Sequence, residues 1–414
     1  MKKKDIKLKS NNKKGYIPNY ELTTNIGFKN IGNTCYMNSF LQIILHIPNF
    51  LPELKKIMNI EKDSLIFNLI KLSEYPSNDK YLYEIKKIMG KIDIKYGEFI
   101  QSDTQSFAID FINAMINQIK NETSFSSISS QSEDYDNVKI EDIKKKKFNI
   151  FKSDLEKRGE KTFIEDLFLF IDFSTRYKDN LINVKTMSFN LLSNLELFFP
   201  KNNENKSFTL YELLDIKYSS SNINDKSNKF SKIEEEEIKQ KVEKNESFFT
   251  KYFSGFINTL LSPCLKNKIK EENTHEEQAS KTIVNEYKII KNEIQMSEIS
   301  EIKVISKIVS LPKILIISFV RGIEGKKLIS SFVSFYDKLD LNKYIDFDLY
   351  DTNLGTTYKL YAINLRYGNT KSSGHCYSYV KVNDIWFCYN DTSVLKENPK
   401  YDLDSVVGLY YIKD

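Results

Sequence analysis

Residues 27–48, GFKNIGNTCYMNSFLQIILHIP, decide how the first part of the chain folds. The apolar residues that follow Cys35 have the spacing of a helix with one buried face, and they are Met37, Phe40, Leu41, Ile44 and Leu45. Asn33 and Thr34 are candidate capping residues before this run, and Pro48 marks its end. The pattern therefore predicts a helix whose first turn contains Cys35.

The position of Cys35 in a first helical turn has a chemical consequence. Unpaired backbone N–H groups and the helix dipole favour an anion there, so the pKa of a thiol falls and the thiolate becomes available as a nucleophile. A buried structural cysteine is the other interpretation, since cysteine also packs well in apolar surroundings. A base near Cys35 is needed to decide between the two.

The chain has three histidines that can supply such a base. His46 lies at the far end of the same predicted helix, too far along it to reach Cys35, and His275 lies in a strongly charged segment. His375 opens the alternating run HCYSYVKV after a glycine-containing turn, which predicts a strand. His375 is the candidate base, although by itself it also fits a packed strand histidine without a role.

A hairpin after His375 supplies a third group. Asn383 and Asp384 form a natural two-residue turn between two strand-like runs. This register makes Asn390 a same-face diagonal neighbour of His375 and turns Asp391 to the other face. An amide oxygen on one imidazole nitrogen fixes the tautomer and leaves the other nitrogen for the thiol. A loop of odd length would exchange Asn390 for Asp391.

The four cysteines are widely scattered and include no C-x-x-C pair. The sequence therefore predicts neither a disulfide framework nor a zinc module. A zinc site from His375, Cys376 and Cys388 is a poor alternative, because His375 and Cys376 are adjacent in a strand and point to opposite faces. This use of cysteine favours a reducing compartment, the cytosol or the nucleus.

Composition and charge limit the class of protein. The chain has 414 residues and a formal net charge of +5, with acidic and basic residues nearly balanced and mostly interleaved. A dedicated nucleic-acid binder has a concentrated basic stripe, so we expect no nucleic-acid partner. There is no apolar secretory signal at the start and no uncharged apolar run long enough to span a bilayer, so we expect no membrane association.

The chain changes from helical to β-rich along its length, which predicts an α+β fold whose two parts face each other. The runs DLFLFIDFST (166–175) and LELFF (195–199) have the character of strands. The predicted organisation is a flexible basic tail at 1–25, helices at 26–120, a linker or loop at 121–160, a mixed region at 161–310 with a charged insertion at about 218–290, and strands at 311–414.

Several stretches resemble the motifs of one family. GFKNIGNTCYMNSFLQ resembles the cysteine box of the ubiquitin-specific proteases, which are papain-like deubiquitinating enzymes, and GHCYSYVKVNDIWFCYND resembles their histidine box. Between them, QSDTQSFAIDFINAM (101–115), LPKILIISFVRG (311–322) and KLDLNKYI (338–345) match further boxes in family order. The resemblance covers residues 26–414 and implies a papain-like catalytic domain with a helical thumb, a β-rich palm and β fingers over 161–310.

The roles of the family transfer position by position. Cys35 matches the nucleophile, His375 the base and Asn390 the residue that orients it, in agreement with the predicted hairpin. Asn30 matches the oxyanion-hole position, and Asp391 matches a second polar position that supports the site. The implied reaction is hydrolysis of the bond after the C-terminal glycine of ubiquitin, and it needs no cofactor.

The resemblance also implies contacts with the substrate. Gln101, Asp103 and Tyr379 match substrate-binding positions, and Asp103 matches the acidic residue that meets the arginine-containing tail of ubiquitin. Taken alone, Asp103 is a helix cap before an apolar run. The implied partners are ubiquitin and ubiquitinated proteins. Independently of the resemblance, the charged insertion at 218–290 is a candidate docking site for a further protein partner.

Four departures from the family pattern leave alternatives open. Ser102 stands where a second glutamine is usual, Ser106 where glutamate is usual, and Cys376 where tyrosine is usual. The fingers lack the two C-x-x-C pairs that bind zinc in many relatives, so no metal is expected. The alternatives are a protease for another ubiquitin-like modifier and a weakly active or inactive ubiquitin-binding scaffold.

Overall fold

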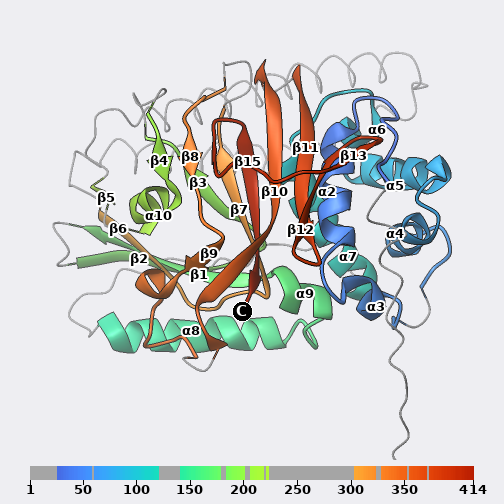
Figure 1. The fold of residues 1–414 in the computed structure, drawn as a ribbon. Coiled ribbons are helices and arrows are strands. Elements are labelled where there is room, and N and C mark those ends of the chain that lie inside the picture. The colour runs from blue at the N-terminus through green and yellow to red at the C-terminus, as the bar shows by residue number, and fades with distance from the viewer. Residues whose placement is uncertain are drawn as a thin grey trace, which may run out of the picture.

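The computed structural model describes residues 26–57, 60–120, 140–178, 183–200, 206–218, 221–222, 303–322, 328–351, 354–370 and 373–414 (Figure 1). The predicted tail at 1–25 and the part of the predicted insertion beyond residue 222 lie outside the described residues. Within the described ranges, no helix combines the length and the apolar character that crossing a membrane requires.

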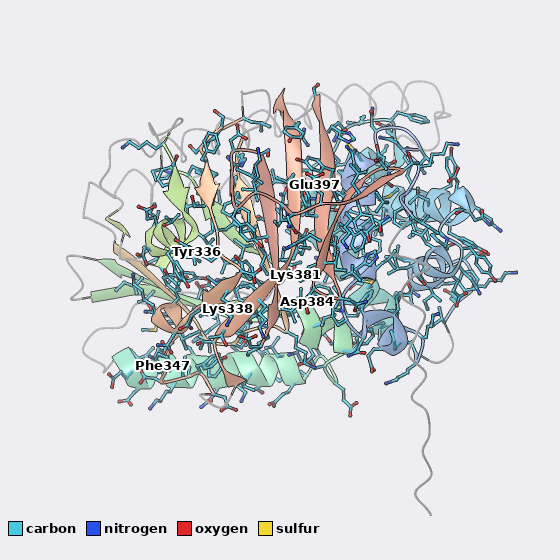
Figure 2. All side chains as sticks on the ribbon, viewed as in Figure 1. Tyr336, Lys338, Phe347, Lys381, Asp384 and Glu397 are labelled. Atoms are coloured by element: carbon cyan, nitrogen blue, oxygen red, sulfur yellow. The ribbon has the colours of Figure 1, made fainter. Side chains whose placement is uncertain are left out.

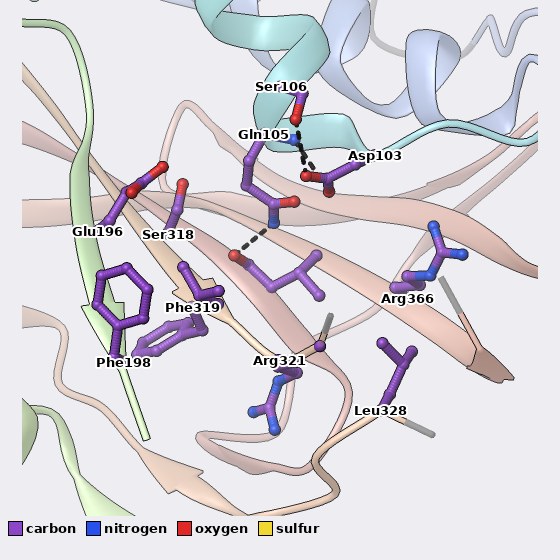
Figure 3. A pocket seen from close by; sticks show the side chains of 13 residues that line it. Asp103, Gln105, Ser106, Glu196, Phe198, Ser318, Phe319, Arg321, Leu328 and Arg366 are labelled. Carbon is purple, nitrogen blue, oxygen red and sulfur yellow. Dashed lines mark hydrogen bonds between the residues drawn. The ribbon is translucent and has the colours of Figure 1, made fainter. Parts of the chain in front are cut away.

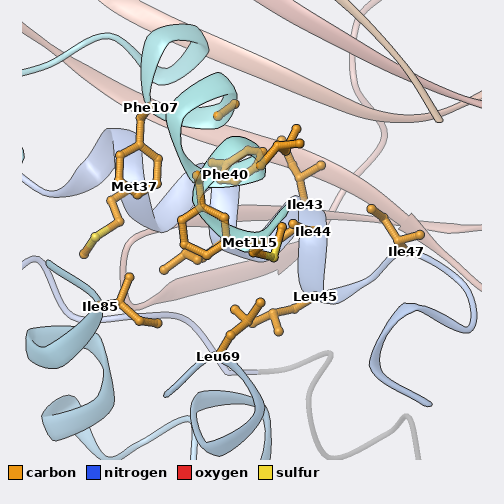
Figure 4. Close-up of a cluster of buried hydrophobic side chains, with 14 of the residues drawn as sticks. Met37, Phe40, Ile43, Ile44, Leu45, Ile47, Leu69, Ile85, Phe107 and Met115 are labelled. Carbon is orange, nitrogen blue, oxygen red and sulfur yellow. The ribbon is translucent and has the colours of Figure 1, made fainter. Parts of the chain in front are cut away.

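Helix α2 (Cys35–Leu45) is the centre of the helical part. It packs against strand β11 (Ser373–Val382) and against helix α7 (Thr104–Lys120). In the apolar cluster of Figure 4, the rings of Phe40 and Phe107 meet edge to face at a centroid distance of 5.9 Å, a favoured aromatic geometry. The other helices of this part are α3 (Phe50–Leu54), α4 (Leu65–Glu74), α5 (Asp79–Ile92) and α6 (Ile94–Gly97).

Helix α2 is buried on all sides, whereas its apolar stripe predicts one buried face. All 11 of its residues are buried, including the polar ones. The Asn38 side-chain amide donates to Asp391 Oδ1 at 2.8 Å, and the Gln42 amide donates to the carbonyl of Ile26 at 3.0 Å. Buried polar groups are tolerated when they are paired in this way. The polar face of α2 therefore faces other parts of the chain rather than solvent.

The predicted capping of α2 is confirmed in position for Thr34, but no side-chain hydrogen bond caps the helix. Thr34 occupies the N-cap position, but its hydroxyl accepts from the backbone N–H of Ile31 at 3.0 Å. Asn33 has a φ of 52° and donates to the carbonyl of Phe99 at 2.7 Å. Both residues hold the loop before the helix, so no side chain caps the N–H groups of the turn that begins at Cys35.

An eight-stranded sheet forms the β-rich part, with the strand order β13-β12-β11-β10-β15-β7-β3 and with β9 paired to β10. Strand β7 alternates between two apolar clusters: Ile314 and Ile316 join the cluster that contains α2, and Leu315 and Ile317 join the other. Both faces of the sheet are thus covered, which explains its near-continuous apolar runs. The strands besides β11 are β3 (Leu195–Phe198), β7 (Ile314–Val320), β9 (Lys338–Asp340), β10 (Thr357–Thr370), β12 (Ile385–Asn390), β13 (Ser393–Lys396) and β15 (Val406–Lys413).

Two smaller sheets and the remaining helices lie beside this sheet (Figure 1). One sheet has four strands in the order β2-β1-β6-β5, and the other has three in the order β14-β8-β4. The elements are β1 (Phe170–Lys178), β2 (Asn183–Leu192), β4 (Phe208–Thr209), β5 (Ser221–Asn222), β6 (Lys303–Ile308), β8 (Val333–Ser334), β14 (Asp402–Leu403), α8 (Ile140–Glu156), α9 (Phe163–Phe168), α10 (Leu210–Tyr218) and the short 3-10 helix η1 (Asn342–Tyr344).

The prediction of a linker or loop at 121–160 is wrong for its second half, which forms α8. Ile143 and Phe151 of this helix are buried in a small cluster with Phe189 of β2. Lys144, also buried, pairs with Asp346 at 3.0 Å. The lysine-rich composition led to the wrong prediction, because a few apolar residues at helical spacing are enough to stabilise a helix that packs against a sheet.

The prediction of a strand over 166–175 is wrong at its beginning. Residues up to Phe168 form helix α9, and strand β1 begins only at Phe170. The helix starts with a capping box, in which the Thr162 hydroxyl accepts from the Glu165 N–H and the Glu165 carboxylate accepts from the Thr162 N–H. These reciprocal bonds outweigh the strand propensity of the following run. The run LELFF does form a strand, β3, but it joins the eight-stranded sheet rather than the predicted fingers.

Candidate active site

Donors from distant parts of the chain surround the sulfur of Cys35. Cys35 is the first residue of α2 and is only 2% exposed. The backbone N–H of Cys376 in β11 donates to Cys35 Sγ at 3.4 Å, and Gln101 Nε2 donates to it at 3.4 Å. Together with the helix N-terminus, these donors stabilise a negative charge on the sulfur.

His375 and Asn390 lie as the predicted hairpin requires. The turn residues Asn383 and Asp384 both have positive φ, and the pairing of β11 with β12 runs from this turn without a slip (Asp384 is labelled in Figure 2). His375 Nε2 lies 2.6 Å from Asn390 Oδ1. Because an amide oxygen only accepts, this bond assigns the proton to Nε2 and leaves Nδ1 for Cys35, with which the ring also hydrogen-bonds.

The surroundings shift both pKa values in the direction that an ion pair requires. Hydrogen bonds from the Cys376 thiol, from His375, from the Cys376 backbone and from Gln101 lower the pKa of Cys35 to about 4, against the opposing effect of burial. The hydrogen bonds to Cys35 and Asn390 raise the pKa of His375 to about 9. A thiolate and an imidazolium therefore coexist over a wide pH range.

Asp391 connects the segments that surround the sulfur. Its carboxylate accepts from the Asn30 side-chain amide at 3.0 Å and from the Asn38 amide at 2.8 Å. The oxygen of the Asn30 amide accepts from the backbone N–H groups of Gly32 at 3.2 Å and of Thr34 at 3.1 Å. Both ends of the Asn30 side chain are thus held, and its Nδ2 has a second hydrogen left to donate.

Asp103 borders a pocket of about 190 Å³ beside the sheet (Figure 3). Glu196 of β3 lines the same pocket, as do Ser106 and Arg321. The Ser106 hydroxyl donates to Asp103 Oδ2 at 3.1 Å and so orients that carboxylate. Arg321 Nε and Nη1 donate to the backbone carbonyls of Val406, Ile329 and Ser331, and its buried Nη2 has no partner among the described residues. The pocket is therefore lined by two carboxylates, Asp103 and Glu196, and by two guanidinium groups, Arg321 and Arg366.

The other two predicted substrate residues lie away from this pocket. Gln101 lies at the sulfur of Cys35. Tyr379 is buried in the cluster on the far face of the sheet from α2, and its hydroxyl donates to Glu397 at 2.9 Å (Glu397 is labelled in Figure 2). The structure thus separates three residues that the sequence analysis groups together.

Arg366 is a residue of this region that the sequence analysis missed. It is buried, lines the pocket, and donates to the carbonyl of Ser102 at 3.3 Å. It pairs with Cys376 across β10 and β11, in a ladder whose register shifts between Tyr367 and Thr370. The β10–β11 pairing would have revealed it, but an irregular ladder gives no register to count from.

The alternative zinc site finds no support. Cys376 belongs to the apolar cluster around α2, whereas Cys388 belongs to the cluster on the opposite face. Among the described residues there is no group of three or more histidine, cysteine, aspartate or glutamate side chains that could hold a metal ion.

Solved structures with a similar fold include modules of the SAGA complex. They include the Ubp8/Sgf11/Sus1/Sgf73 module bound to ubiquitin aldehyde, a Ubp8-substituted module bound to monoubiquitin, and the yeast module with a substituted Sgf73. Their TM-scores are 0.57, 0.58 and 0.58 at 15%, 14% and 15% identity. Each match covers 95% of this chain and 70%, 70% and 69% of the other chain.

This likeness confirms the expected α+β, papain-like fold. Comparison with curated protein sequences gives no match. In contrast, the sequence model of the ubiquitin carboxyl-terminal hydrolase family matches residues 26–411, which is nearly the whole chain. The chain therefore belongs to the ubiquitin carboxyl-terminal hydrolase family and is a deubiquitinase.

Proposed function

We propose that this deubiquitinase is a cysteine-type peptidase with Cys35 as its nucleophile and His375 as its general acid and base. The observation that carries the proposal is the geometry at the first turn of α2, where the Cys376 N–H and the Gln101 amide donate to Cys35 Sγ and Asn390 holds the His375 ring. These surroundings lower the pKa of Cys35 to about 4 and raise that of His375 to about 9. Between these values the sulfur is already a thiolate and the ring already holds the proton that the leaving group needs. The 2.6 Å bond to Asn390 holds the ring in this orientation.

The reaction follows from these states. The Cys35 thiolate attacks the carbonyl carbon of the terminal glycine of ubiquitin, which is joined to its target by an isopeptide or peptide bond. His375 gives its proton to the leaving amine, and a thioester remains. His375 then takes a proton from the water that attacks the thioester, which releases ubiquitin and restores the thiolate.

Asn30 is the proposed side-chain donor for the oxyanion. Its amide is held by Asp391 at one end and by the backbone of the Cys35 loop at the other, so it needs no reorganisation when charge develops. The uncapped backbone N–H groups at the start of α2 are the second source of donors. In this scheme Asp391 is a positioning residue.

The pocket beside Asp103 is the proposed contact for the arginine-containing tail of ubiquitin. Ser106 replaces the glutamate that is usual in the family, but Glu196 of strand β3 brings a second carboxylate to the same pocket. Carboxylates bind guanidinium groups through strong, charge-assisted hydrogen bonds. Gln101 is proposed to act at the sulfur instead, where its amide stabilises the thiolate.

Ubiquitin and ubiquitinated proteins are the proposed partners, and the cytosol or nucleus is the proposed compartment because a thiolate nucleophile needs reducing surroundings. The similar solved modules contain Ubp8 together with Sgf11, Sus1 and Sgf73. By analogy, the charged insertion at 218–290 is the candidate region for docking a partner protein. The second candidate function is a protease for another ubiquitin-like modifier, which the loss of a carboxylate at Ser106 favours.

Reaction of the full chain with ubiquitin that carries a thiol-reactive group at its C-terminus tests the proposal. The expected result is a covalent adduct that forms with the native chain and is absent from the folded variant Cys35→Ala. An adduct that persists in Cys35→Ala would refute the assignment of the nucleophile. An adduct with another modifier and none with ubiquitin would support the second candidate.

A further inference from the structure

Cys376 places a second thiol in contact with Cys35. Gln101 Nε2 lies 3.4 Å from Cys35 Sγ and 3.9 Å from Cys376 Sγ, so both sulfurs border the same amide. The backbone nitrogen of Cys376 is 3.4 Å from Cys35 Sγ, and the Cys376 side chain is the largest cause of the lowered pKa of Cys35. The third cysteine of the described residues, Cys388, lies in the other apolar cluster.

The two cysteines come from elements that pack directly together, α2 and β11. A disulfide needs Cα atoms about 4.4–6.8 Å apart and side chains that point toward each other. The Cys376 backbone nitrogen lies 3.4 Å from Cys35 Sγ, and the Gln101 amide borders both sulfurs, so the two side chains meet where α2 packs on β11. A bridge between them would join two elements that already pack together.

We propose that Cys35 and Cys376 form a dithiol site that reacts with hydroperoxides and closes to an intramolecular disulfide. The proposal rests on the proposed function in one respect, namely that Cys35 is a reactive thiolate. The part that goes beyond the proposed function concerns Cys376, which stands where the family usually has tyrosine. We assign Cys376 the role of the resolving thiol, which attacks the oxidised sulfur of Cys35.

Both steps balance. The Cys35 thiolate attacks one oxygen of hydrogen peroxide or of an alkyl hydroperoxide, an S–O bond forms, and the O–O bond breaks. The sulfur is oxidised to a sulfenic acid, and the peroxide is reduced to water or an alcohol with one proton from His375 or solvent. Cys376 then attacks the sulfenic sulfur, an S–S bond forms, and the S–O bond breaks. The oxygen leaves as water with the proton of the Cys376 thiol.

The surroundings of Cys376 favour this order of events. In the resting site, the neighbouring Cys35 and burial hold the pKa of Cys376 well above its ordinary value, so Cys376 stays a thiol. Oxidation turns the Cys35 thiolate into a neutral sulfenic acid and removes that repulsion. Arg366 Nη1, 4.0 Å from Cys376 Sγ, then favours the Cys376 thiolate. Cys376 thus becomes reactive only after Cys35 has been oxidised.

The consequence is reversible inactivation. The disulfide occupies the nucleophile and keeps it from further oxidation to sulfinic and sulfonic acids, which thiols do not reverse. Cellular thiols reduce the disulfide and restore both cysteines. The site would stop deubiquitination during exposure to peroxide and release it afterwards.

The test uses the reduced full chain, treated with hydrogen peroxide, alkylated at its remaining thiols and digested without reductant. Mass spectrometry then measures the cross-linked peptide pair of Cys35 with Cys376 and the sulfinic acid at Cys35. Cys376→Ser and Cys376→Ala remove the proposed resolving thiol, and Cys388→Ser is the matched control. Activity regained with dithiothreitol is expressed relative to the untreated sample of each variant.

The wild type and Cys388→Ser are expected to form the peptide pair and to regain nearly all of their own starting activity. Cys376→Ser and Cys376→Ala are expected to accumulate sulfinic acid at Cys35 and to lose most of their recoverable activity. The proposal is overturned if the wild type forms no peptide pair while Cys35 reaches the sulfinic state. The peptide measurement needs no deubiquitinase activity and no variant, so its failure is distinct from failure of the ubiquitin adduct.

Discussion

The side-chain amide of Asn30 donates a 3.0 Å hydrogen bond to the carboxylate of Asp391, 361 residues later in the chain. The same carboxylate holds Asn38 of α2, so one charge joins the loop before Cys35, the helix that carries Cys35, and the end of β12. The two segments approach closely, since a Cβ at Gly27 would lie 2.1 Å from the carbonyl oxygen of Asp391. The proposed oxyanion donor is therefore fixed before any substrate binds.

Substitution of this pair tests the fixed donor. Removing the amide with Asn30→Ala should lower kcat by roughly 10²–10³-fold, the usual effect of losing one oxyanion donor. Asp391→Asn should lower kcat by less, because the donor remains but is no longer held by a charge. KM should change little in both variants, since the interaction forms in the transition state. Steady-state hydrolysis of a fluorogenic ubiquitin substrate measures both constants.

Asp384→Asn is the matched control for Asp391→Asn, because Asp384 also has positive φ and lies at the far end of the same strand. Its kcat should equal that of the wild type. An equal loss of kcat in the two variants would show that the effect comes from the hairpin fold rather than from the Asn30 contact.

The pH dependence of the rate should follow the ion pair. Acidification through about 4 protonates the Cys35 thiolate and removes the nucleophile, and alkalinisation through about 9 removes the His375 proton that the leaving amine needs. The profile of kcat/KM should therefore be bell-shaped, with a plateau between these limits. Initial rates in constant-ionic-strength buffers measure it.

Alkylation by iodoacetamide separates the two limbs of this profile. The reaction needs only the thiolate, so Cys35 should stay reactive down to about its pKa of 4. Cys388, whose pKa burial raises to about 11, is the internal comparison and should react only in strong alkali. A Cys35 rate that rises only near the ordinary pKa of a thiol would contradict the ion pair.

Two substitutions at Asn390 distinguish orientation from charge. Asn390→Ala removes the acceptor of the 2.6 Å bond and should lower kcat by roughly 10- to 10²-fold, less than the loss of a general base itself. Asn390→Asp keeps an acceptor oxygen and adds a negative charge, so kcat should largely survive and the alkaline limb should move to higher pH. An unchanged limb in Asn390→Asp would mean that residue 390 does not contact the ring.

The pocket beside Asp103 should affect binding rather than chemistry. Asp103→Asn and Glu196→Gln remove the two carboxylates that line it, so KM for a ubiquitin substrate should rise while kcat stays close to that of the wild type. A ubiquitin substrate whose tail arginines are replaced should be insensitive to both substitutions. Full sensitivity with that substrate would place the tail elsewhere.

Asp172 allows a stability prediction away from the site. This carboxyl is 5% exposed, and burial raises its pKa to about 6, despite the Tyr218 hydroxyl 3.4 Å from it. The folded state thus holds a proton that the unfolded state has lost, so stability falls as pH rises from about 4 to about 6. Asp172→Asn should remove this loss and raise the free energy of unfolding at neutral pH by about 3 kcal/mol.

Urea unfolding over the range from below pH 4 to neutral pH measures this effect. Asp172→Asn and the wild type should have similar stability at the acidic end and should diverge toward neutral pH. Parallel curves, with the same difference at every pH, would mean that Asp172 does not titrate in this range.

The sequence determined the local parts of this site. The helix at Cys35–Leu45 follows from apolar spacing, and the contact of His375 with Asn390 follows from a two-residue turn and strand alternation. Both inferences depend on the regular spacing of side chains along a helix or a strand, which holds within one element or one hairpin. The prediction of a linker at 121–160 was wrong because the few apolar residues of α8 stabilise a helix only when they pack against the neighbouring sheet.

Tertiary structure decided which residues meet across the chain. Gln101 and Cys376 reach the sulfur of Cys35, and Arg366 reaches Cys376, only because α2, β10, β11 and the segment before α7 pack together. The same packing takes Tyr379 to the opposite face of the sheet from Cys35. No period in the sequence encodes such contacts, since they depend on how the helical part docks on the sheet. The sequence alone determined the candidate nucleophile and base, while docking decided how their charges are tuned.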